Sequence, residues 1–328
     1  LTLGGGPSAT TLEDAIYQAL RFDFAPERAA LLALLQLALC LGLLSFWHGL
    51  AEPMPSSAGV RRPLRRPDRA TRWSRLADAS VLSLAGVFLL TPLLAIVLSG
   101  MTAELPALLA EAAIARALML SLAVAALASL LAALLAAGLL IGVRELRRRR
   151  ASERWAQPLL SVGLGMLALP PIVLGAGWFI LLLALGDPLA FGLTAVVVAN
   201  ALMALPYFLR ALDAALLDLD ARTGALCASL GIGGWNRFRL VDWVELRRPL
   251  GTALGLSFAL SLGDLGVIAL FGGRESATLP LLLYQRMGAY RMEEAAAIAL
   301  LLALLCLGVT TLADSATRNR VEQRRDIN

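Results

Sequence analysis

Seven long apolar runs constrain the fold of this chain more than any other feature of its sequence. Each run holds about 20 or more residues, the length that a helix needs to cross the hydrocarbon core of a bilayer. Backbone polar groups find no water in hydrocarbon, so the runs are predicted to be helices. Hydrophobic residues make up 59% of the chain, more than a soluble protein could cover with polar surface. We therefore predict an all-α polytopic membrane protein with about seven transmembrane helices, at 28–49, 79–101, 114–143, 157–184, 190–215, 250–272 and 293–314.

Arginine alone supplies the 29 basic residues, and its placement predicts the orientation of the spans. About 22 arginines fall in alternate connections and the C-terminal tail, against 6 in the other connections. Cytoplasmic loops carry the basic excess, so residues 50–78, 144–156, 216–249 and 315–328 are predicted to be cytoplasmic. The four arginines at 147–150 fit an anchor that meets headgroups of the lipid bilayer. No nucleic acid partner is expected, because the arginines alternate with spans and lack interleaved aromatic residues.

Catalytic and metal-binding chemistry finds little support in the sequence. His48 is the single histidine, and Cys40, Cys227 and Cys306 lack the spacing of a metal site. Every basic residue is Arg, so the chain has no Lys for a phosphate-binding P-loop. We expect a protein that is not an enzyme, has no cofactor or metal site, and depends on a partner for any ATP hydrolysis.

The opening of the chain resembles its own end, which predicts an internal repeat. Gly5-Gly6, Thr11-Leu12 and Tyr17-Gln18 match Gly272-Gly273, Thr278-Leu279 and Tyr284-Gln285 at a single offset of 267 residues. Chance similarity in Leu- and Ala-rich sequence is the alternative. Parallel repeats occur in transporters whose pathway lies between two halves. Residues 1–49 would then be the last outer loop and helix of a first, N-terminally truncated half. Residues 50–78 would be an Arg- and Pro-rich linker, 79–314 a complete six-helix half, and 315–328 a cytoplasmic tail.

Residues 218–249 form the most elaborate connection between two spans, and their pattern predicts a helix, a break and a second helix. Leu219, Leu226 and Leu230 lie near one face of the first helix, and the glycine-rich residues 231–234 break it. Trp235, Phe238 and Val241 recur at helical spacing in the second. Two short amphipathic helices exceed what a simple connection needs, so we expect this segment to dock a soluble partner.

Within this segment, Gly231, Trp235, Phe238 and Arg239 resemble the cytoplasmic coupling loop of binding-protein-dependent ABC importer permeases. The resemblance implies a type I ABC importer permease-like transmembrane domain in a bacterial inner membrane, working by alternating access. It also implies two partners, cytoplasmic ABC ATPase subunits and a periplasmic substrate-binding protein. The residues implied in ATPase coupling are Ala225, Ser229, Gly231, Trp235, Arg237, Phe238 and Arg239. The family's loop has Glu where this chain has Ala225, so shape, arginine and aromatic contacts are expected to replace its ionic contact.

A narrower resemblance, to thiamine transporter permeases, runs along nearly the whole chain. It rests on Ser-Leu-Gly-Ile at 229–232, Ser-Leu-Gly-Asp-Leu-Gly-Val at 261–267, Ala-Leu-Phe-Gly at 269–272, and the sequence from Thr278 to Gln285. It implies import of thiamine or its phosphates; permeases for iron(III) share part of the pattern and are an alternative. An ion-coupled secondary transporter is a further alternative, but it would need more intramembrane carboxylates and no loop around Trp235.

Asp264 is the first candidate for the substrate pathway, because a carboxylate within a span is costly unless it faces protein or water. Its charge could attract a cation such as thiamine, or it could be structural and accept hydrogen bonds from neighbouring helix ends. Asn200, Pro170 and Pro171 interrupt other spans. They could line the same pathway or form simple packing kinks, and the sequence leaves both alternatives open.

Overall fold

The computed structural model describes residues 10–50, 72–102, 110–149, 153–273 and 276–325, and every regular element within these ranges is helical. Most of the predicted linker, at 51–71, lies outside the described residues, as do Gly5, Gly6 and Arg150. The elements are α1 (Leu12–Arg21), α2 (Pro26–Leu50), α3 (Arg72–Thr102), α5 (Ala112–Arg148), η2 (Glu153–Trp155), α6 (Ala156–Gly165), η3 (Met166–Ala168), α7 (Pro171–Leu185), α8 (Gly192–Ser229), α9 (Gly234–Arg237), η4 (Phe238–Asp242), α10 (Trp243–Leu262), α11 (Gly266–Phe271), α12 (Leu279–Gly288) and α13 (Met292–Arg325).

The predicted spans are confirmed in number and place. Within the described residues, six helical stretches are long and apolar enough to cross a membrane, and a seventh is counted when the bent pair α6–η3 and α7 is taken as one span. That seventh span, predicted at 157–184, differs in shape because the chain turns by 99° between η3 and α7. Pro170 is the N-cap of α7 and Pro171 its first residue. Neither has a backbone N–H to donate, so a helix cannot continue through them and the expected kink is a full break.

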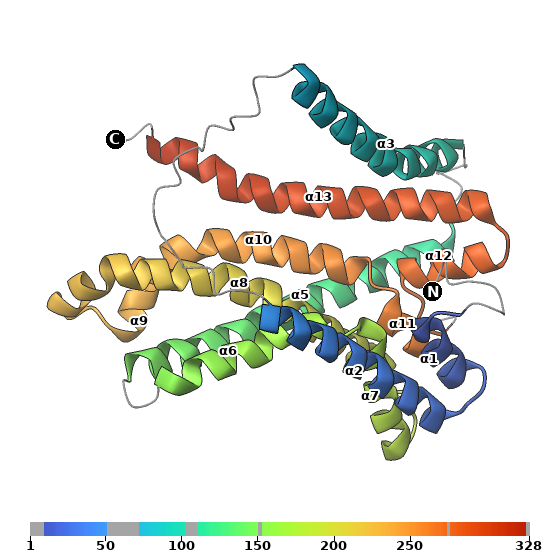
Figure 1. The fold of residues 1–328 in the computed structure, drawn as a ribbon, viewed down its shortest axis with the longest axis horizontal. Coiled ribbons are helices and arrows are strands. Elements are labelled where there is room, and N and C mark those ends of the chain that lie inside the picture. The colour runs from blue at the N-terminus through green and yellow to red at the C-terminus, as the bar shows by residue number, and fades with distance from the viewer. Residues whose placement is uncertain (1–9, 51–71, 103–109, 150–152, 274–275, 326–328) are drawn as a thin grey trace.

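Three long helices, α5, α8 and α10, pack against one another at the centre of the molecule (Figure 1). Small residues allow the close approach: Ala132 and Ala136 of α5 and Ala201 of α8 are fully buried. α13 covers α10, where a Cβ added at Gly255 would lie 2.4 Å from the Cβ of Ala313. The central bundle is therefore held by helix-to-helix packing of small side chains.

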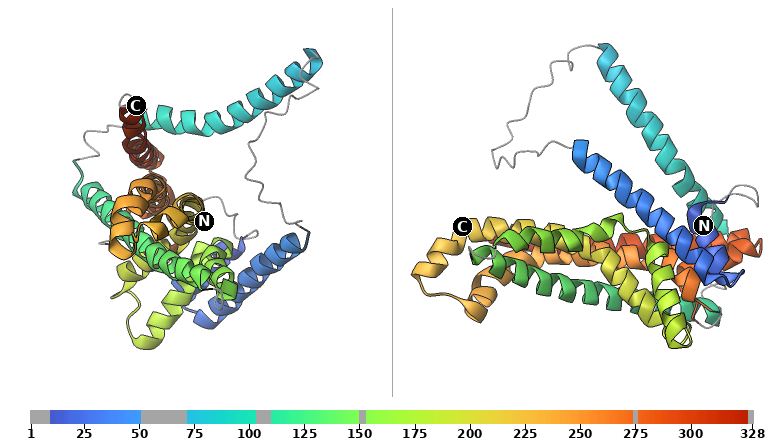
Figure 2. Two further views of the ribbon diagram at one scale, coloured as in Figure 1. Left: turned by 90° about the vertical axis from the view of Figure 1, so that its left-hand side faces the viewer. Right: turned by 60° about the horizontal axis from the view of Figure 1, so that its bottom comes forward.

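α3 lies on the outer side of α13 and diverges from the rest of the bundle (Figure 2). It contacts α13 near its C-terminal end, where a Cβ at Gly100 would meet Leu300 and the carbonyl of Ala296. Its leucine, valine and phenylalanine side chains are otherwise exposed, and none of its most apolar stretch is buried. Such a surface suits contact with lipid tails or with further membrane helices.

The hairpins α1–α2 and α12–α13 share local conformation as well as sequence. α1 and α12 cover ten residues each at the offset of 267, and each ends with an N–H donated to a glutamine carbonyl, Gln18 at 2.9 Å and Gln285 at 3.0 Å. A non-glycine residue with positive φ then follows in both, Phe24 at 49° and Tyr290 at 59°. Arg21, at the end of α1, donates to the carbonyl of Gly272 at 3.2 Å, so α1 lies beside the connection between α11 and α12.

Candidate functional site

The polar segment after residue 215 continues a membrane helix instead of forming its own. α8 runs unbroken from Gly192 to Ser229, so the prediction of a separate short helix before the break is wrong. Charged residues in this part of α8 are paired within the protein. For example, Arg147 of α5 donates to both carboxylate oxygens of Asp213, at 2.5 and 3.2 Å. Among the three leucines predicted on one face, Leu219 is buried while Leu226 and Leu230 are exposed.

Glycines make the break where the sequence predicts it. Gly231 and Gly234 have φ of 65° and 55°, in the left-handed region that favours glycine. The chain reverses there, and α9, the π-helical η4 and α10 return alongside α8 (Figure 1). We call residues 230–242 the turn. The turn lies at the same end of the bundle as the C-terminal ends of α5 and α13, the end that the arginine pattern assigns to the cytoplasm (Figure 1).

Behind the turn, an ion-pair network joins it to α5 and α8. Arg144 of α5 donates to both oxygens of Asp220, at 3.0 and 2.7 Å, and to both oxygens of Asp242, at 2.6 and 3.1 Å. Arg237 of α9 pairs with Asp220 and lies 3.5 Å from Asp242. Arg237 and Asp242 are buried. A buried charge that loses its partner is costly, so these four side chains hold α5, α8 and the turn in one arrangement.

The network changes the interpretation of Arg237. The sequence places it among the residues expected to contact an ATPase, but its side chain is only 7% exposed and points inward to Asp220 and Asp242. Its position follows from the turn, because the reversal at 231–234 carries α9 back toward the end of α5. Arg237 therefore fixes the turn from the inside, and it does not present its charge on the outer surface.

The remaining coupling candidates lie on the outer surface of the turn and of the end of α8. Ala225, Ser229, Gly231, Trp235, Phe238 and Arg239 are all exposed. Trp235 stacks on Phe238 with ring centroids 5.2 Å apart, and Phe238 meets Trp243 at 6.1 Å. These three rings, which we call the aromatic patch, are 72%, 37% and 46% exposed. Large aromatic side chains beyond the end of a membrane helix are typical of a protein-docking surface, where such residues are enriched.

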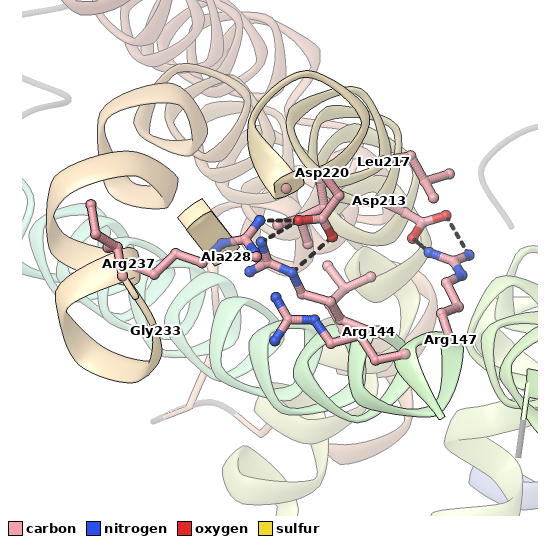
Figure 3. Close-up of a pocket in the computed structure, with 13 residues that line it drawn as sticks. Arg144, Arg147, Asp213, Leu217, Asp220, Ala228, Gly233 and Arg237 are labelled. Carbon is pink, nitrogen blue, oxygen red and sulfur yellow. Dashed lines mark hydrogen bonds and ion pairs between the residues drawn. The ribbon is translucent and has the colours of Figure 1, made fainter. Parts of the chain in front are cut away.

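A cavity of about 490 Å³ opens between α5, α8 and the turn (Figure 3). Arg144, Arg147 and Arg237 line it together with Asp213 and Asp220, and Arg148 of α5 lines it as well. Gly224, Ala228 and Gly233 form a small-residue wall, and Leu140, Leu216, Leu217 and Ile232 add an apolar part. The cavity is therefore both basic and partly apolar.

A second cluster forms where helices break inside the membrane. The predicted span 250–272 is interrupted between α10 and α11, and Asp264 lies in the gap. Its Oδ1 accepts the N–H of Gly266 at 3.2 Å, at the start of α11, while its Oδ2 is buried without a hydrogen-bond partner. Pro171 lies against the same point, since a Cβ at Gly266 would be 3.3 Å from the Cβ of Pro171.

Asn200 approaches this cluster from α8. It is buried, and its side-chain amide donates to the Oγ of Ser261 at 2.9 Å, near the end of α10. The structure thus brings Asp264, Asn200 and Pro171 together from three elements distant in sequence, with Pro170 at the adjoining break. The contact of Oδ1 with Gly266 fits the structural alternative for Asp264, and the unpartnered Oδ2 leaves room for the pathway alternative.

Sequence reasoning missed the network residues Arg144, Asp220 and Asp242. Arg144 and Asp220 are separated by 76 residues and Arg144 and Asp242 by 98, so no local pattern joins them. One signal was available: Asp213 and Asp220 lie seven residues apart on one helix, and Arg144 and Arg147 three apart on another. Each pair falls on one helix face, and the two faces carry complementary charges.

Comparison with known proteins finds relatives among transport permeases. No protein-family model matches the chain. The thiamine transport system permease protein ThiP of Brucella abortus (strain 2308) is 43% identical over 323 residues, covering 98% of this chain and 59% of that protein. The protein of that name from Escherichia coli (strain K12) is 43% identical, covering 98% and 60%. A probable sulfate transport system permease protein cysT of Zygnema circumcarinatum is 25% identical over 154 residues, 46% of this chain and 54% of that protein.

The chain thus spans about three fifths of the length of these permease relatives, with 59% and 60% covered. The match extends along nearly all of its own residues, through the apolar helices and the turn alike. The chain is thus similar, along nearly all of its residues, to proteins named thiamine transport system permease protein, and with its membrane spans it is a multi-pass bacterial inner-membrane protein.

Proposed function

We propose that this chain is the permease part of an ATP-driven importer that moves thiamine, or its phosphates, into the cytoplasm by alternating access. The observation that supports this most is the 43% identity, over 98% of the chain, to proteins named as thiamine transport system permeases. The chain has no Lys for a P-loop, so ATP would be hydrolysed by a separate cytoplasmic ABC ATPase. A periplasmic substrate-binding protein would deliver the cargo at the opposite end.

In this proposal the ATPase docks on the aromatic patch. Trp235 is the most exposed of the three aromatic residues, so it offers the most surface to a partner. Burying such side chains supplies much of the binding energy at protein interfaces. The ion-pair network behind the patch ties the turn to α5 and α8, so a displacement of the turn moves both helices. Transport then requires that the ATPase bind two permease states with different affinities.

The proposal includes a membrane domain with two halves. Residues 1–49 would end the first half, 79–314 would form the second, and 50–78 and 315–328 would be cytoplasmic linker and tail. The shared conformation of the hairpins α1–α2 and α12–α13 supports this division. α1 and α2 pack on α7 and α11 through Ile16, Leu20, Val267 and Phe271. That contact would be part of the interface between the halves.

The cluster around Asp264 is the proposed point of contact with the cargo. Thiamine carries a positive charge, and the unpartnered Oδ2 of Asp264 offers a negative one inside the bundle. The helix breaks beside it, at 263–265 and at Pro170 and Pro171, provide backbone groups that are free of helical hydrogen bonds. Irregular backbone of this kind is tolerated at membrane depth where it lines a cavity or is covered by protein.

Uptake of labelled thiamine tests the function. The full-length permease is expressed with its ATPase and binding protein in cells that lack other thiamine transport, and the control omits only the ATPase. Uptake is expected with all three components and is expected to vanish in the control. Undiminished uptake without the ATPase would point to a secondary transporter. Transport of iron(III) with no thiamine uptake would assign a different cargo.

A further inference from the structure

The lining of the basic cavity between α5, α8 and the turn includes none of the three residues of the aromatic patch. Three of its four arginines are neutralised by neighbouring carboxylates: Arg147 by Asp213, and Arg144 and Arg237 by Asp220 and Asp242. Arg148 differs. It lines the cavity, it is exposed, and within the part of the chain that the structure describes it forms no ion pair. The cavity therefore offers one unpaired guanidinium beside three paired ones.

The paired arginines can also donate further hydrogen bonds. A guanidinium has five N–H donors, and Arg147 uses two of its nitrogens for Asp213. Arg148 also lines the cavity, and each guanidinium is a planar fork of donors that suits the oxygens of a phosphate. The carboxylates of Asp213 and Asp220 keep the cavity from an excessive positive charge but leave a net positive lining. The chemistry of the lining thus favours an anion with several oxygens, such as a phosphate ester.

The apolar part of the cavity narrows the choice of anion. Leu140 and Leu216 are at the ends of two predicted membrane runs, and Leu217 and Ile232 continue the apolar lining. The cavity therefore spans the level at which a bilayer changes from hydrocarbon to headgroups, on the side assigned to the cytoplasm. Basic pockets between membrane helices at this level bind anionic lipid headgroups. A carboxylate of a soluble partner would match the arginines but not the leucines.

We propose that this cavity is a binding site for the phosphate headgroup of an anionic phospholipid of the cytoplasmic leaflet. Arg148 and Arg147 bind the phosphate, and Leu216 and Leu217 contact the glycerol and the first methylene groups. A volume of about 490 Å³ accommodates a headgroup with its glycerol. The lipid would wedge between α5 and α8 next to the ion-pair network, at the junction from which the turn emerges.

Two substitutions and one matched control test the site without touching the aromatic patch. Gly224→Trp fills the cavity, because a side chain at this helical position meets open space within 4 Å. Arg148→Gln removes the unpaired charge. Arg149→Gln removes a neighbouring exposed charge that pairs with Glu145, outside the cavity lining. The full-length permease is assembled with its ATPase in nanodiscs of phosphatidylcholine with a minor share of phosphatidylglycerol, and retained lipid is measured by native mass spectrometry after mild delipidation.

Wild-type protein is expected to retain phosphatidylglycerol over phosphatidylcholine. Gly224→Trp should abolish this retention, and Arg148→Gln should weaken it about fivefold, the effect of one arginine at a membrane surface. Arg149→Gln should leave it unchanged. Equal losses for Arg148→Gln and Arg149→Gln would show only diffuse surface attraction and overturn the proposal. Displacement by inorganic phosphate without preference for phosphatidylglycerol would assign a free-phosphate site instead. Loss of ATPase binding in Arg148→Gln with unchanged lipid retention would assign the cavity to the protein partner.

Discussion

Replacing Asp220 by Asn tests whether the ion-pair network holds the turn against α5. The carboxylate of Asp220 accepts two hydrogen bonds from Arg144 and pairs with Arg237. Asn keeps the size of the side chain and removes its charge, so the two guanidiniums must share Asp242. Asp218→Asn is the matched control on the same helix. Its ion pair with Arg222 is exposed at both ends.

The expected cost follows from burial. Removing one partner of a buried ion pair costs about 3–5 kcal/mol. Asp220 is 33% exposed and Arg144 19%, and Asp242 still faces both arginines, so the cost is discounted to about 2–3 kcal/mol. At about 1.4 kcal/mol for each factor of ten, the turn should open about 30 to 150 times more often. The exposed pair of Asp218 is worth about 0.3–0.5 kcal/mol, which gives a factor of about two.

Hydrogen exchange of the backbone amides at 230–242 measures this opening in the full-length permease assembled with its ATPase. Asp220→Asn is expected to exchange tens of times faster than wild type, with Asp218→Asn close to wild type. Thiamine uptake per ATP hydrolysed should fall in Asp220→Asn alone. Exchange at 230–242 that is within about twofold of the Asp218→Asn control would refute the reasoning, because the network would then add nothing to the rigidity of the turn.

Three further substitutions test the proposed roles of single residues. Trp235→Ala should weaken ATPase co-purification about 30-fold, the effect of an interface hot spot of about 2 kcal/mol, and undiminished co-purification would remove the aromatic patch as the docking site. Gly231→Leu forces a side chain into φ 65° and should uncouple ATP hydrolysis from uptake, while Gly233→Leu, at φ −136° and with open space around its Cβ, should not. Asp264→Asn should assemble normally and lose thiamine uptake; normal uptake would make Asp264 a structural residue.

Apolar length and glycine placement were enough to predict the spans and the break at 231–234, because both are local properties. The continuity of α8 was not predictable in the same way. Asp213, Asp218 and Asp220 read as the edge of a membrane run, whereas two of them are paired with arginines of α5. Their partners lie 66 or more positions away in the sequence. The local sequence therefore does not distinguish these paired aspartates from aspartates exposed to water. The bend between η3 and α7 was underestimated for a related reason, since two prolines predict an interruption but not its angle.

The candidate site was predictable in outline and not in orientation. Helical spacing places Trp235 and Phe238 on one side of the second helix, and the structure gives them an exposed stack. The same spacing says nothing about Arg237, which points inward because the turn folds back on α5. Asp264 and Asn200 were singled out as isolated polar residues in apolar runs. Their proximity depends on the packing of α8 against α10, which no single run encodes.

Under the proposed function, the placement of acidic residues accounts for a coupling loop that has Ala225 where the resembled ABC importer permeases have a glutamate. Between Ala225 and Trp243 the one acidic residue is Asp242, and it is buried against Arg144 and Arg237. Asp220 and Asp242 therefore stiffen the turn from within, and residues 235–239 expose aromatic rings and Arg239. A turn that is stiffened in this way can pass a displacement to α5 and α8. It needs no ion pair with the ATPase to do so, because the partner can push on it through packing contacts. The affinity of the turn for an ATPase should then depend on the burial of aromatic surface more than on charge. It should therefore change little with salt concentration, because salt does not screen hydrophobic burial.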